Sequence, residues 1–213
     1  MDNNVKIVLE KRIKTTISNL EKRNMNGYLV RNVNELHKQI TELIPDDSTV
    51  SVGGSMTLFE TGVIDYLRDR KVTFYDRYEE GLTADDITEI YRKSFSVSGY
   101  LASTNAITEQ GEIYNVDGRG NRVAAMIYGP DKVILVVGTN KIVKDIDEAI
   151  ERNRRIAAPA NVQRLDRKTP CHVTGYCTRC NSPDKICNAY TIIDGQMSKG
   201  RMHIIFIDGT YGY

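Results

Sequence analysis

The chain has 213 residues, of which 40% are hydrophobic, and its 29 lysines and arginines nearly balance 28 aspartates and glutamates. This length is long for one domain and short for two, and it can bury a core without disulfide bonds. The near-neutral charge gives no overall field for nucleic acid or an anionic membrane, so neither is expected as a partner.

No membrane span or export signal is predicted. The N-terminal residues lack a charged-then-apolar signal pattern, and no uninterrupted apolar run reaches about 18 residues. We therefore expect a cytoplasmic protein, whose thiols are kept reduced.

Helices and strands alternate along the chain, the helices marked by apolar residues three and four apart and the strands by short apolar runs. In chain order we predict helices over 4–24 and 32–44, a strand at 48–52, a helix over 53–69, a strand at 71–76, a helix over 82–95, a strand at 99–103, a hairpin arm at 112–116, a strand at 131–137, a helix over 144–157 and a strand at 201–208. Thr83 and Asp86 have the spacing of a capping box.

This alternation predicts an α/β fold with a mainly parallel sheet flanked by helices. No internal repeat or low-complexity tract divides the chain, so we predict a single domain over 1–213. Within it, 4–44 forms a helical N-terminal segment. Residues 159–200 form a cysteine-bearing excursion, which begins near Pro159 where helical periodicity is lost.

Four polar or glycine-rich loops follow predicted strands: "VGGSMT", "STNAIT", "NVDGRGNR" and "GTNK". Each alone is also typical of an ordinary turn or helix start. Because parallel strands end at one edge of a sheet, we expect the loops to form one pocket for a small anionic substrate. The expected lining is Gly53, Gly54, Ser55, Thr57, Asn105, Thr108, Asp117, Asn121, Arg122 and Lys141.

Three of these loop and helix residues are catalytic candidates: Glu60, Asp117 and Lys141. Glu60 lies one helical turn beyond the glycine loop, so it is predicted either as a general base or as an exposed helix acid. Arg122 and Lys141 are expected to hold the carboxylate or phosphate of the substrate.

All four cysteines fall within residues 170–187, at Cys171, Cys177, Cys180 and Cys187. In a reducing compartment such a group indicates metal ligands, although ordinary thiols or a disulfide remain open. Cys177 and Cys180 form one close pair, whereas a zinc ribbon uses two. The spacing therefore favours a [4Fe–4S] cluster, with zinc as the alternative and His172 as a substitute ligand.

Other polar residues are given structural interpretations. His37 is expected to be exposed, and His203 in the last strand to be structural. The arginines at 152, 154 and 155 are interpreted as a solvated helix face. The sequence contains no Ser–His–Asp elbow, Walker loop or dinucleotide fingerprint.

Four blocks of the sequence resemble the lactate-utilisation (LUD) domain family, in particular its short members that end in a four-cysteine segment. The blocks are "GGSMTLFETG", "STNAITEQGEIYNVDGRGNRVAAMIYGPDKVILVVGTNKIV", "AIERNRRIAAPAN" and "TPCHVTGYCTRCNSPDKICN", and the resemblance covers about residues 5 to 213. It implies an α/β fold like that of the sugar-isomerase and CoA-transferase superfamily, close to formyltetrahydrofolate cyclo-ligase.

The family is named after bacterial operons that oxidise lactate to pyruvate, in which partner subunits carry iron–sulfur clusters. The resemblance thus implies a role in oxidising lactate or a similar 2-hydroxy acid, with other lactate-oxidation subunits as partners. The chain lacks the paired ferredoxin-type cysteine runs of the cluster-bearing partner.

Two other functions remain open. One is a non-redox transferase, isomerase or sensor that binds a phosphorylated or CoA-like anion and carries a structural zinc. The other is an accessory subunit without chemistry of its own. A homo-oligomer is compatible with each of these functions.

Overall fold

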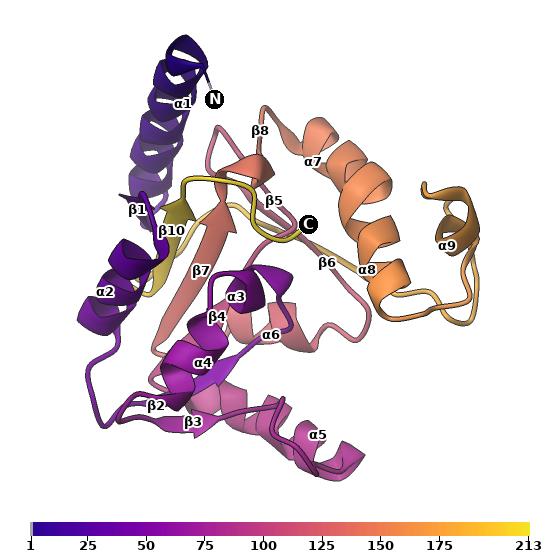
Figure 1. Ribbon diagram of the computed structural model, residues 1–213, viewed down its shortest axis with the longest axis horizontal. Coiled ribbons are helices and arrows are strands. Elements are labelled where there is room, and N and C mark those ends of the chain that lie inside the picture. The colour runs from indigo at the N-terminus through magenta and orange to yellow at the C-terminus, as the bar shows by residue number, and fades with distance from the viewer. Residues whose placement is uncertain (1) are drawn as a thin grey trace.

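Apolar runs form the strands at the centre of the protein. The computed structural model describes residues 2–213, and its largest sheet has six strands (Figure 1). In spatial order these are β1 (Asn26–Val30), β10 (Met202–Ile207), β7 (Lys132–Gly138), β4 (Gly99–Ala102), β2 (Thr49–Val52) and β3 (Thr73–Tyr75). Every neighbouring pair is parallel. The predicted parallel α/β fold is therefore confirmed.

Helices cover both faces of this sheet. On one face α1 (Asn3–Lys22) and α6 (Asn121–Ile127) pack on side chains such as Leu135 of β7. On the other face α2 (Val33–Leu43) and α4 (Val63–Arg68) pack on side chains such as Ile134. Successive residues of β7 thus enter opposite cores, which explains why its sequence is a continuous apolar run rather than an alternating one.

The short helices α3 (Met56–Glu60) and α5 (Ala84–Lys93) flank β2 and β3 along the chain. The predicted capping box at the start of α5 is present, because the side chains of Thr83 and Asp86 each bond the other's backbone N–H. The predicted helix over 53–69 is divided into α3 and α4 at Gly62, whose φ of 65° lies in the left-handed region.

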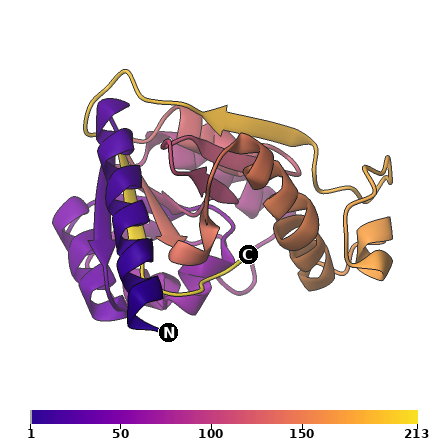
Figure 2. The same ribbon diagram turned by 90° about the horizontal axis from the view of Figure 1, so that it is seen from above.

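A second, smaller sheet lies beside the first, and the sequence indicated only one of its arms. Its order is β8 (Ile142–Val143), β5 (Ala106–Thr108), β6 (Ile113–Asp117) and β9 (Ala189–Ile193), with β6 antiparallel to both β5 and β9. The predicted hairpin arm is β6. Figure 2 shows β9 as the broad arrow that leads from the cysteine segment back toward the main sheet.

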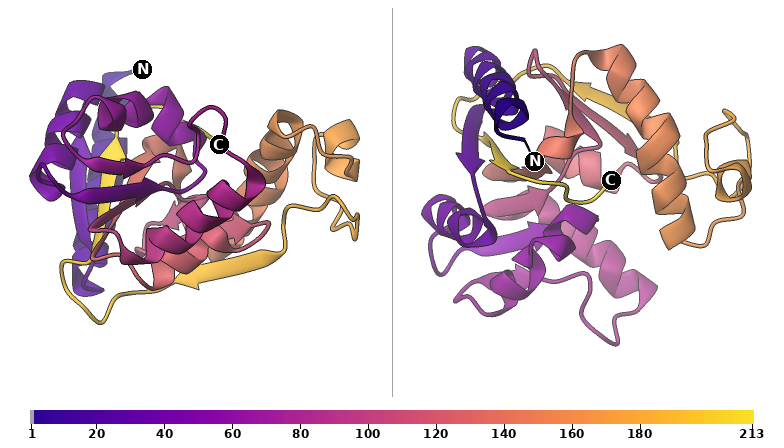
Figure 3. Two further views of the ribbon diagram at one scale, coloured as in Figure 1. Left: turned by 90° about the horizontal axis from the view of Figure 1, so that it is seen from below. Right: turned by 45° about the horizontal axis from the view of Figure 1, so that its top comes forward.

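The predicted helix over 144–157 continues well beyond its expected end. It consists of α7 (Ile146–Arg152), a π-helical turn over Asn153–Ala157 and α8 (Ala158–Arg164). Pro159 does not end it, because the π-helical turn precedes the proline and the Arg154 carbonyl, one turn before it, accepts the Cys177 N–H instead of a helical N–H. A one-turn helix, α9 (Pro170–Thr174), and the cysteine segment lie beyond α8, on its far side from the main sheet (Figure 3).

Two predicted segments differ from the structure. The segment 4–44 is not wholly helical, because β1 lies between its two helices and forms an edge of the main sheet. The excursion 159–200 contains α8 and β9 as well as the cysteines. Within residues 2–213, no helix combines the length and the apolar character needed to cross a membrane.

Candidate functional site

A cavity of about 520 Å³ lies where strands of the main sheet end. Because β2, β4 and β7 run parallel in adjacent positions, the loops that follow them open on one edge. Seven of the residues predicted for this pocket line it: Gly54, Ser55, Asn105, Asp117, Asn121, Arg122 and Lys141.

The other predicted residues lie outside the lining. Gly53 and Thr57 are buried behind it, and Thr57 contacts Lys141. Thr108 lies in β5, where its hydroxyl bonds the side chain of Glu112. Glu60 is exposed and accepts the Gly212 backbone N–H at 2.6 Å.

Lys141 lies at the floor of the cavity and is only 2% exposed. Its Nζ donates to Thr57 Oγ1 at 2.8 Å and to Ser103 Oγ at 3.1 Å. Among residues 2–213 it forms no ion pair with a carboxylate. Burial, and next the positive charges of Arg152 and Arg122, lower the pKa of Lys141 from 10.5 to about 7. A large fraction of this amine is therefore uncharged at neutral pH.

Arg122 is held from all sides by the protein. Its Nε and Nη2 donate to Asp117 Oδ1 at 2.9 and 2.6 Å. Its other N–H groups bond Ser103 O and the side chains of Asn115 and Asn105. Since every N–H of the guanidinium has an acceptor, Arg122 ties the loops together and has none left for a ligand.

Both carboxylate oxygens of Asp117 also accept hydrogen bonds from the protein. Its Oδ2 accepts the backbone N–H groups of Arg122 and Val123, both at 3.1 Å. Its Oδ1 accepts from the Arg122 guanidinium. In this geometry Asp117 fixes the start of α6 and neutralises Arg122.

Cations that the sequence analysis did not select surround the mouth of the cavity. Arg77, Arg119 and Arg164 line it, and among the described residues none of the three lies within ion-pair distance of a carboxylate. The Arg77 guanidinium carbon lies 4.7 Å from the centre of the Tyr91 ring, and its buried Nε has no hydrogen-bond partner in residues 2–213. Since Asp117 is the one acidic residue of the lining, the cavity wall carries a net positive charge.

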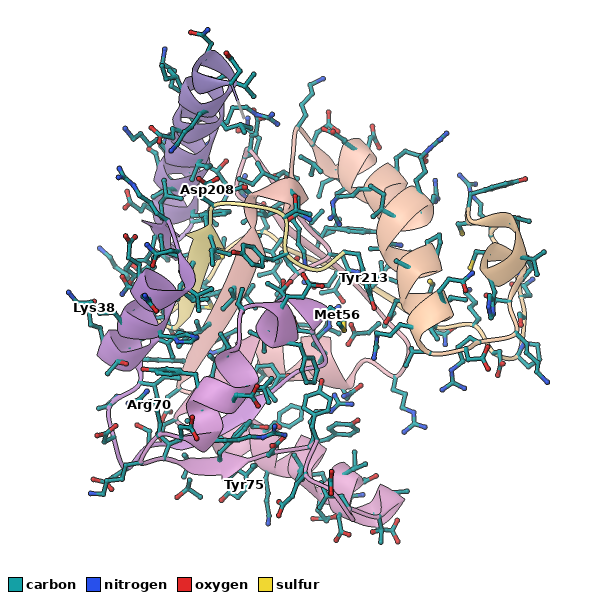
Figure 4. The ribbon with its side chains drawn as sticks, viewed as in Figure 1. Lys38, Met56, Arg70, Tyr75, Asp208 and Tyr213 are labelled. Carbon is teal, nitrogen blue, oxygen red and sulfur yellow. The ribbon has the colours of Figure 1, made fainter. Side chains whose placement is uncertain are left out.

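The C-terminal residues cover Lys141 on the side of α3. Thr57 Oγ1 donates to Tyr211 O at 3.1 Å, and Asn140 Nδ2 donates to Gly212 O at 3.1 Å. Tyr213 then lies between α3 and α8 (Figure 4), where Arg164 Nε donates to its hydroxyl at 2.8 Å. This tail separates Glu60 from the cavity.

Arg152 was interpreted as part of a solvated helix face, and that interpretation is wrong. Arg152 is 8% exposed and donates to the backbone carbonyls of Asn105 and Asn140. It points inward because the residue spacing places it on the face of α7 that packs on the second sheet. Its charge is one of those that lower the pKa of Lys141. On the same helix, Arg154 is half-buried and Arg155 is exposed.

All four cysteines line a second cavity of about 210 Å³ between α8 and the cysteine segment. They are free thiols, with Cys171 buried and the other three half-buried. Burial, followed by the neighbouring thiols, raises the pKa of Cys187 to about 11. Within residues 2–213, no three His, Cys, Asp or Glu side chains form a group able to hold a single metal ion.

The rest of the lining suits a negatively charged group bound through sulfur. Arg154, Arg179 and Lys185 contribute positive charge, and the Arg179 N–H donates to Cys177 Sγ at 3.4 Å. His172 does not line this cavity; its Nδ1 lies 2.9 Å from Arg167 O.

The two cavities share part of one wall. Ala158, Ile186 and Cys187 line both of them. A group held by the four thiols would therefore lie beside whatever occupies the basic cavity.

The remaining histidines have structural surroundings. His203 is buried in β10, with Nδ1 3.0 Å from Tyr28 Oη and Nε2 2.8 Å from Gly200 O. His37 is half-buried rather than exposed, because its ring stacks on Tyr66 at a centroid distance of 4.1 Å.

Comparisons with known proteins agree on the family and the fold. A family model described as the LUD domain matches residues 13–207. A crystal structure of a DUF162 family protein from Deinococcus radiodurans aligns with a TM-score of 0.55 and 15% sequence identity, covering 94% of this chain and 98% of that one. A search among curated proteins finds no significant match.

Proposed function

Since this chain belongs to the LUD domain family, we propose that it takes part in oxidising lactate or a similar small 2-hydroxy acid. In this proposal the substrate binds in the basic cavity, and the four cysteines hold an iron–sulfur cluster. The observation that carries it is the shared wall, where Cys187 belongs to both cavities. The shared wall supports the proposal because an electron acceptor must lie close to the carbon that is oxidised, and a cluster held by Cys187 would border the substrate cavity.

The donor set fits a cluster better than a single zinc ion. Zinc would need its sulfurs about 2.3 Å from one point, and the described side chains contain no such group. Four thiols around a cavity of about 210 Å³ suit a larger group. Oxidation to the 2-oxo acid releases two electrons and two protons. A bound cluster, tuned by the N–H of Arg179 and the nearby cations, would pass the electrons one at a time to the partner subunits, and the proton from the carbon would leave to water.

The chain's own residues would bind the substrate and move its protons. Arg77, Arg119 and Arg164 hold the carboxylate, since their guanidinium groups have no carboxylate partners within the described chain. Lys141 Nζ takes the proton of the 2-hydroxyl, and its pKa of about 7 places it near the operating pH. Arg122 and Asp117 keep the loops in position.

Protein purified under nitrogen tests the proposal. We expect a brown protein with bound iron and sulfide, and a visible spectrum that bleaches when lactate is added with the partner subunits. Cys187→Ala should lose most of the iron, whereas His172→Ala, outside the cysteine cavity, should keep it. A colourless protein with stoichiometric zinc would sink the redox proposal.

A second function is favoured by the size and charge of the basic cavity. Its volume of about 520 Å³ and five lining arginines exceed the needs of a three-carbon acid. A phosphorylated or CoA-like anion would use this space in a non-redox transferase, isomerase or sensor.

Thermal-shift measurements separate the two functions. Stabilisation by sugar phosphates or CoA, with none by lactate or pyruvate, would favour the second. Arg77→Gln and Arg164→Gln should each reduce the stabilisation by the true ligand. Arg155→Gln is the matched control, because Arg155 pairs with Glu151 away from the cavity.

A further inference from the structure

The amine of Lys141 is unusual among the lysines of this protein. It is the one buried lysine in residues 2–213. Its two partners are the neutral hydroxyls of Thr57 and Ser103. The Thr57 hydroxyl donates to Tyr211 O and so accepts from the amine, whereas the Ser103 hydroxyl can donate to an uncharged amine as well as accept from an ammonium group. Lys141 also lines the basic cavity, so its side chain borders the space that a small molecule would occupy.

A nucleophilic amine must be uncharged and must border a space that a substrate can enter, and burial among neutral partners at a cavity wall meets both conditions. At pH 7, an amine with a pKa of about 7 is roughly half unprotonated, whereas one at 10.5 is unprotonated in about one molecule in 3,000. The structure maintains this state by burial and by the positive charges of Arg152 and Arg122, which outweigh the opposing charge of Glu60 behind the C-terminal tail.

The lining also defines which molecules arrive at the amine. Arg77, Arg119 and Arg164 attract an anionic group toward the mouth, away from the buried Nζ. The amine that takes a proton from the 2-hydroxyl of a hydroxy acid would also lie beside the carbonyl carbon of the 2-oxo acid that results. A molecule with both an anionic group and a carbonyl is therefore complementary to the whole cavity.

We propose that Lys141 forms an imine with a small carbonyl compound that carries a carboxylate or a phosphate. The inference rests on the anion site of the proposed function and is independent of the cluster. The Nζ lone pair attacks the carbonyl carbon, a C–N bond forms, and the carbonyl π bond breaks toward its oxygen. The two protons of the nitrogen pass in turn through the Ser103 hydroxyl to that oxygen, the first giving the carbinolamine and the second letting the oxygen leave as water, which gives C=N.

The protonated form of such an imine draws electrons from the neighbouring carbon atom. It would assist removal of a proton from that carbon, which is a reaction class distinct from oxidation of the hydroxyl. The covalent link would also hold a 2-oxo acid product in the cavity until water attacks the imine.

Borohydride trapping tests the proposal in the intact chain. Pyruvate represents the 2-oxo acids, ribose 5-phosphate the sugar phosphates, and propanal a carbonyl without an anionic group. Hydride transfer to the imine carbon gives a stable secondary amine, which peptide mass spectrometry locates. We expect one adduct, at Lys141, with one or both anionic compounds and far less with propanal.

Variants provide the control. Lys141→Arg should lower the trapped adduct by about 100-fold or more, because its guanidinium stays protonated and non-nucleophilic. Lys141→Met serves the same purpose if the larger head group disturbs folding, which circular dichroism checks. Mapping the adduct in the wild-type chain tests the site even if neither variant folds.

Three results would contradict the imine proposal, and they distinguish its failure from failure of the proposed anion site. Adducts spread over exposed lysines would contradict a special role of Lys141. No adduct despite thermal stabilisation by pyruvate or ribose 5-phosphate would reject the imine and leave the anion site standing. Neither adduct nor stabilisation by any anion would reject both.

Discussion

Two arginines of the basic cavity show how the partners of a guanidinium determine its role. Arg122 bonds Asp117 and Asn115 of β6 and the loop after β4 through all its N–H groups. Arg77 has no carboxylate partner in residues 2–213 and leaves a buried N–H unbonded. The first residue therefore contributes to folding, whereas the second retains its capacity for a ligand.

Substitution of these arginines should separate stability from binding. We expect Arg122→Lys to lower the free energy of unfolding by about 3 kcal/mol, because the ammonium cannot replace the fork and leaves buried Asp117 underbonded. Arg77→Gln should change stability by less than about 1 kcal/mol and weaken anion binding. Urea denaturation and thermal shift with phosphate measure the two effects. Equal loss of stability in both variants would contradict this division.

Lys141 should make stability depend on pH. Its pKa is lowered on folding from 10.5 to about 7, so the unfolded chain binds more protons between these values and stability rises with pH across that window. Lys141→Met lacks this dependence. The stability of the variant minus that of the wild type should therefore fall by roughly 2 kcal/mol between pH ~7.5 and pH ~9.5.

Urea denaturation at the two pH values measures that difference, and comparing the variant with the wild type cancels the other titrating groups. Lys144→Met, at an exposed position, is the control and should show a constant difference. A constant difference for Lys141→Met as well would show that its amine titrates normally.

The turn between β2 and α3 contains two adjacent glycines with different surroundings. A Cβ at Gly53 would lie 2.6 Å from Tyr100 Oη and 2.9 Å from Arg122 Cγ. A Cβ at Gly54 would meet Arg77 Nη1 at 3.5 Å, an ordinary contact. Gly53 is thus required because the turn packs directly on the buried Arg122, while Gly54 faces the cavity.

Alanine at each glycine tests this packing. We expect Gly53→Ala to lower the free energy of unfolding by roughly 2 kcal/mol, because the buried ring and guanidinium must move. Gly54→Ala is the matched control and should stay within about 0.5 kcal/mol, since neither glycine has a positive φ. Urea denaturation of the two variants gives the comparison, and similar values for both would refute the packing argument.

The elements that the sequence predicts well are those with a continuous apolar signal. β7 and β10 are apolar runs buried on both faces, and because they pair in parallel, the loop after β7 and the tail after β10 leave the sheet at one edge. β1 and β9 escape prediction because each is an edge strand, β1 starting with the turn pair Asn26–Gly27 and β9 exposing Tyr190 and Ile192. Periodicity carries little information for such strands.

The candidate site is predictable only in part, because local sequence does not show which residues from distant parts of the chain come together. Loop composition after β2 and β7 indicated the neighbourhood of Lys141. It could not distinguish Arg122, which is fully bonded, from an arginine available to a ligand. Arg164 and Tyr213 reach the cavity from distant parts of the chain, on α8 and the C-terminal tail, and no local pattern marks them.

In the molecule as a whole, backbone hydrogen bonds join the cysteine segment, residues 170–188, to the long helix before it and to β6. The Cys177 N–H donates to Arg154 O at 3.0 Å, and the Asn188 N–H donates to Asp117 O at 2.9 Å. Arg179, between these points, is exposed. The Asn188 contact connects the segment to the residue that fixes Arg122.

A group held by all four cysteines should order this segment and protect it from proteolysis. Coordination would cross-link Cys171 on α9 with Cys187 beside β9, so opening the backbone around Arg179 would require breaking metal–sulfur bonds. We expect trypsin to cut after Arg179 at least about tenfold more slowly in iron-reconstituted protein than in metal-free protein, because ligand binding to the folded state lowers the open population.

Cleavage after Lys199, in an exposed loop outside the segment, should proceed at the same rate in both and serves as the internal control. Cys187→Ala should remove the protection at Arg179 and leave cleavage after Lys199 unchanged. Equal rates at Arg179 with and without bound iron would mean that the four thiols do not act together, and the cluster would then have no place in this protein.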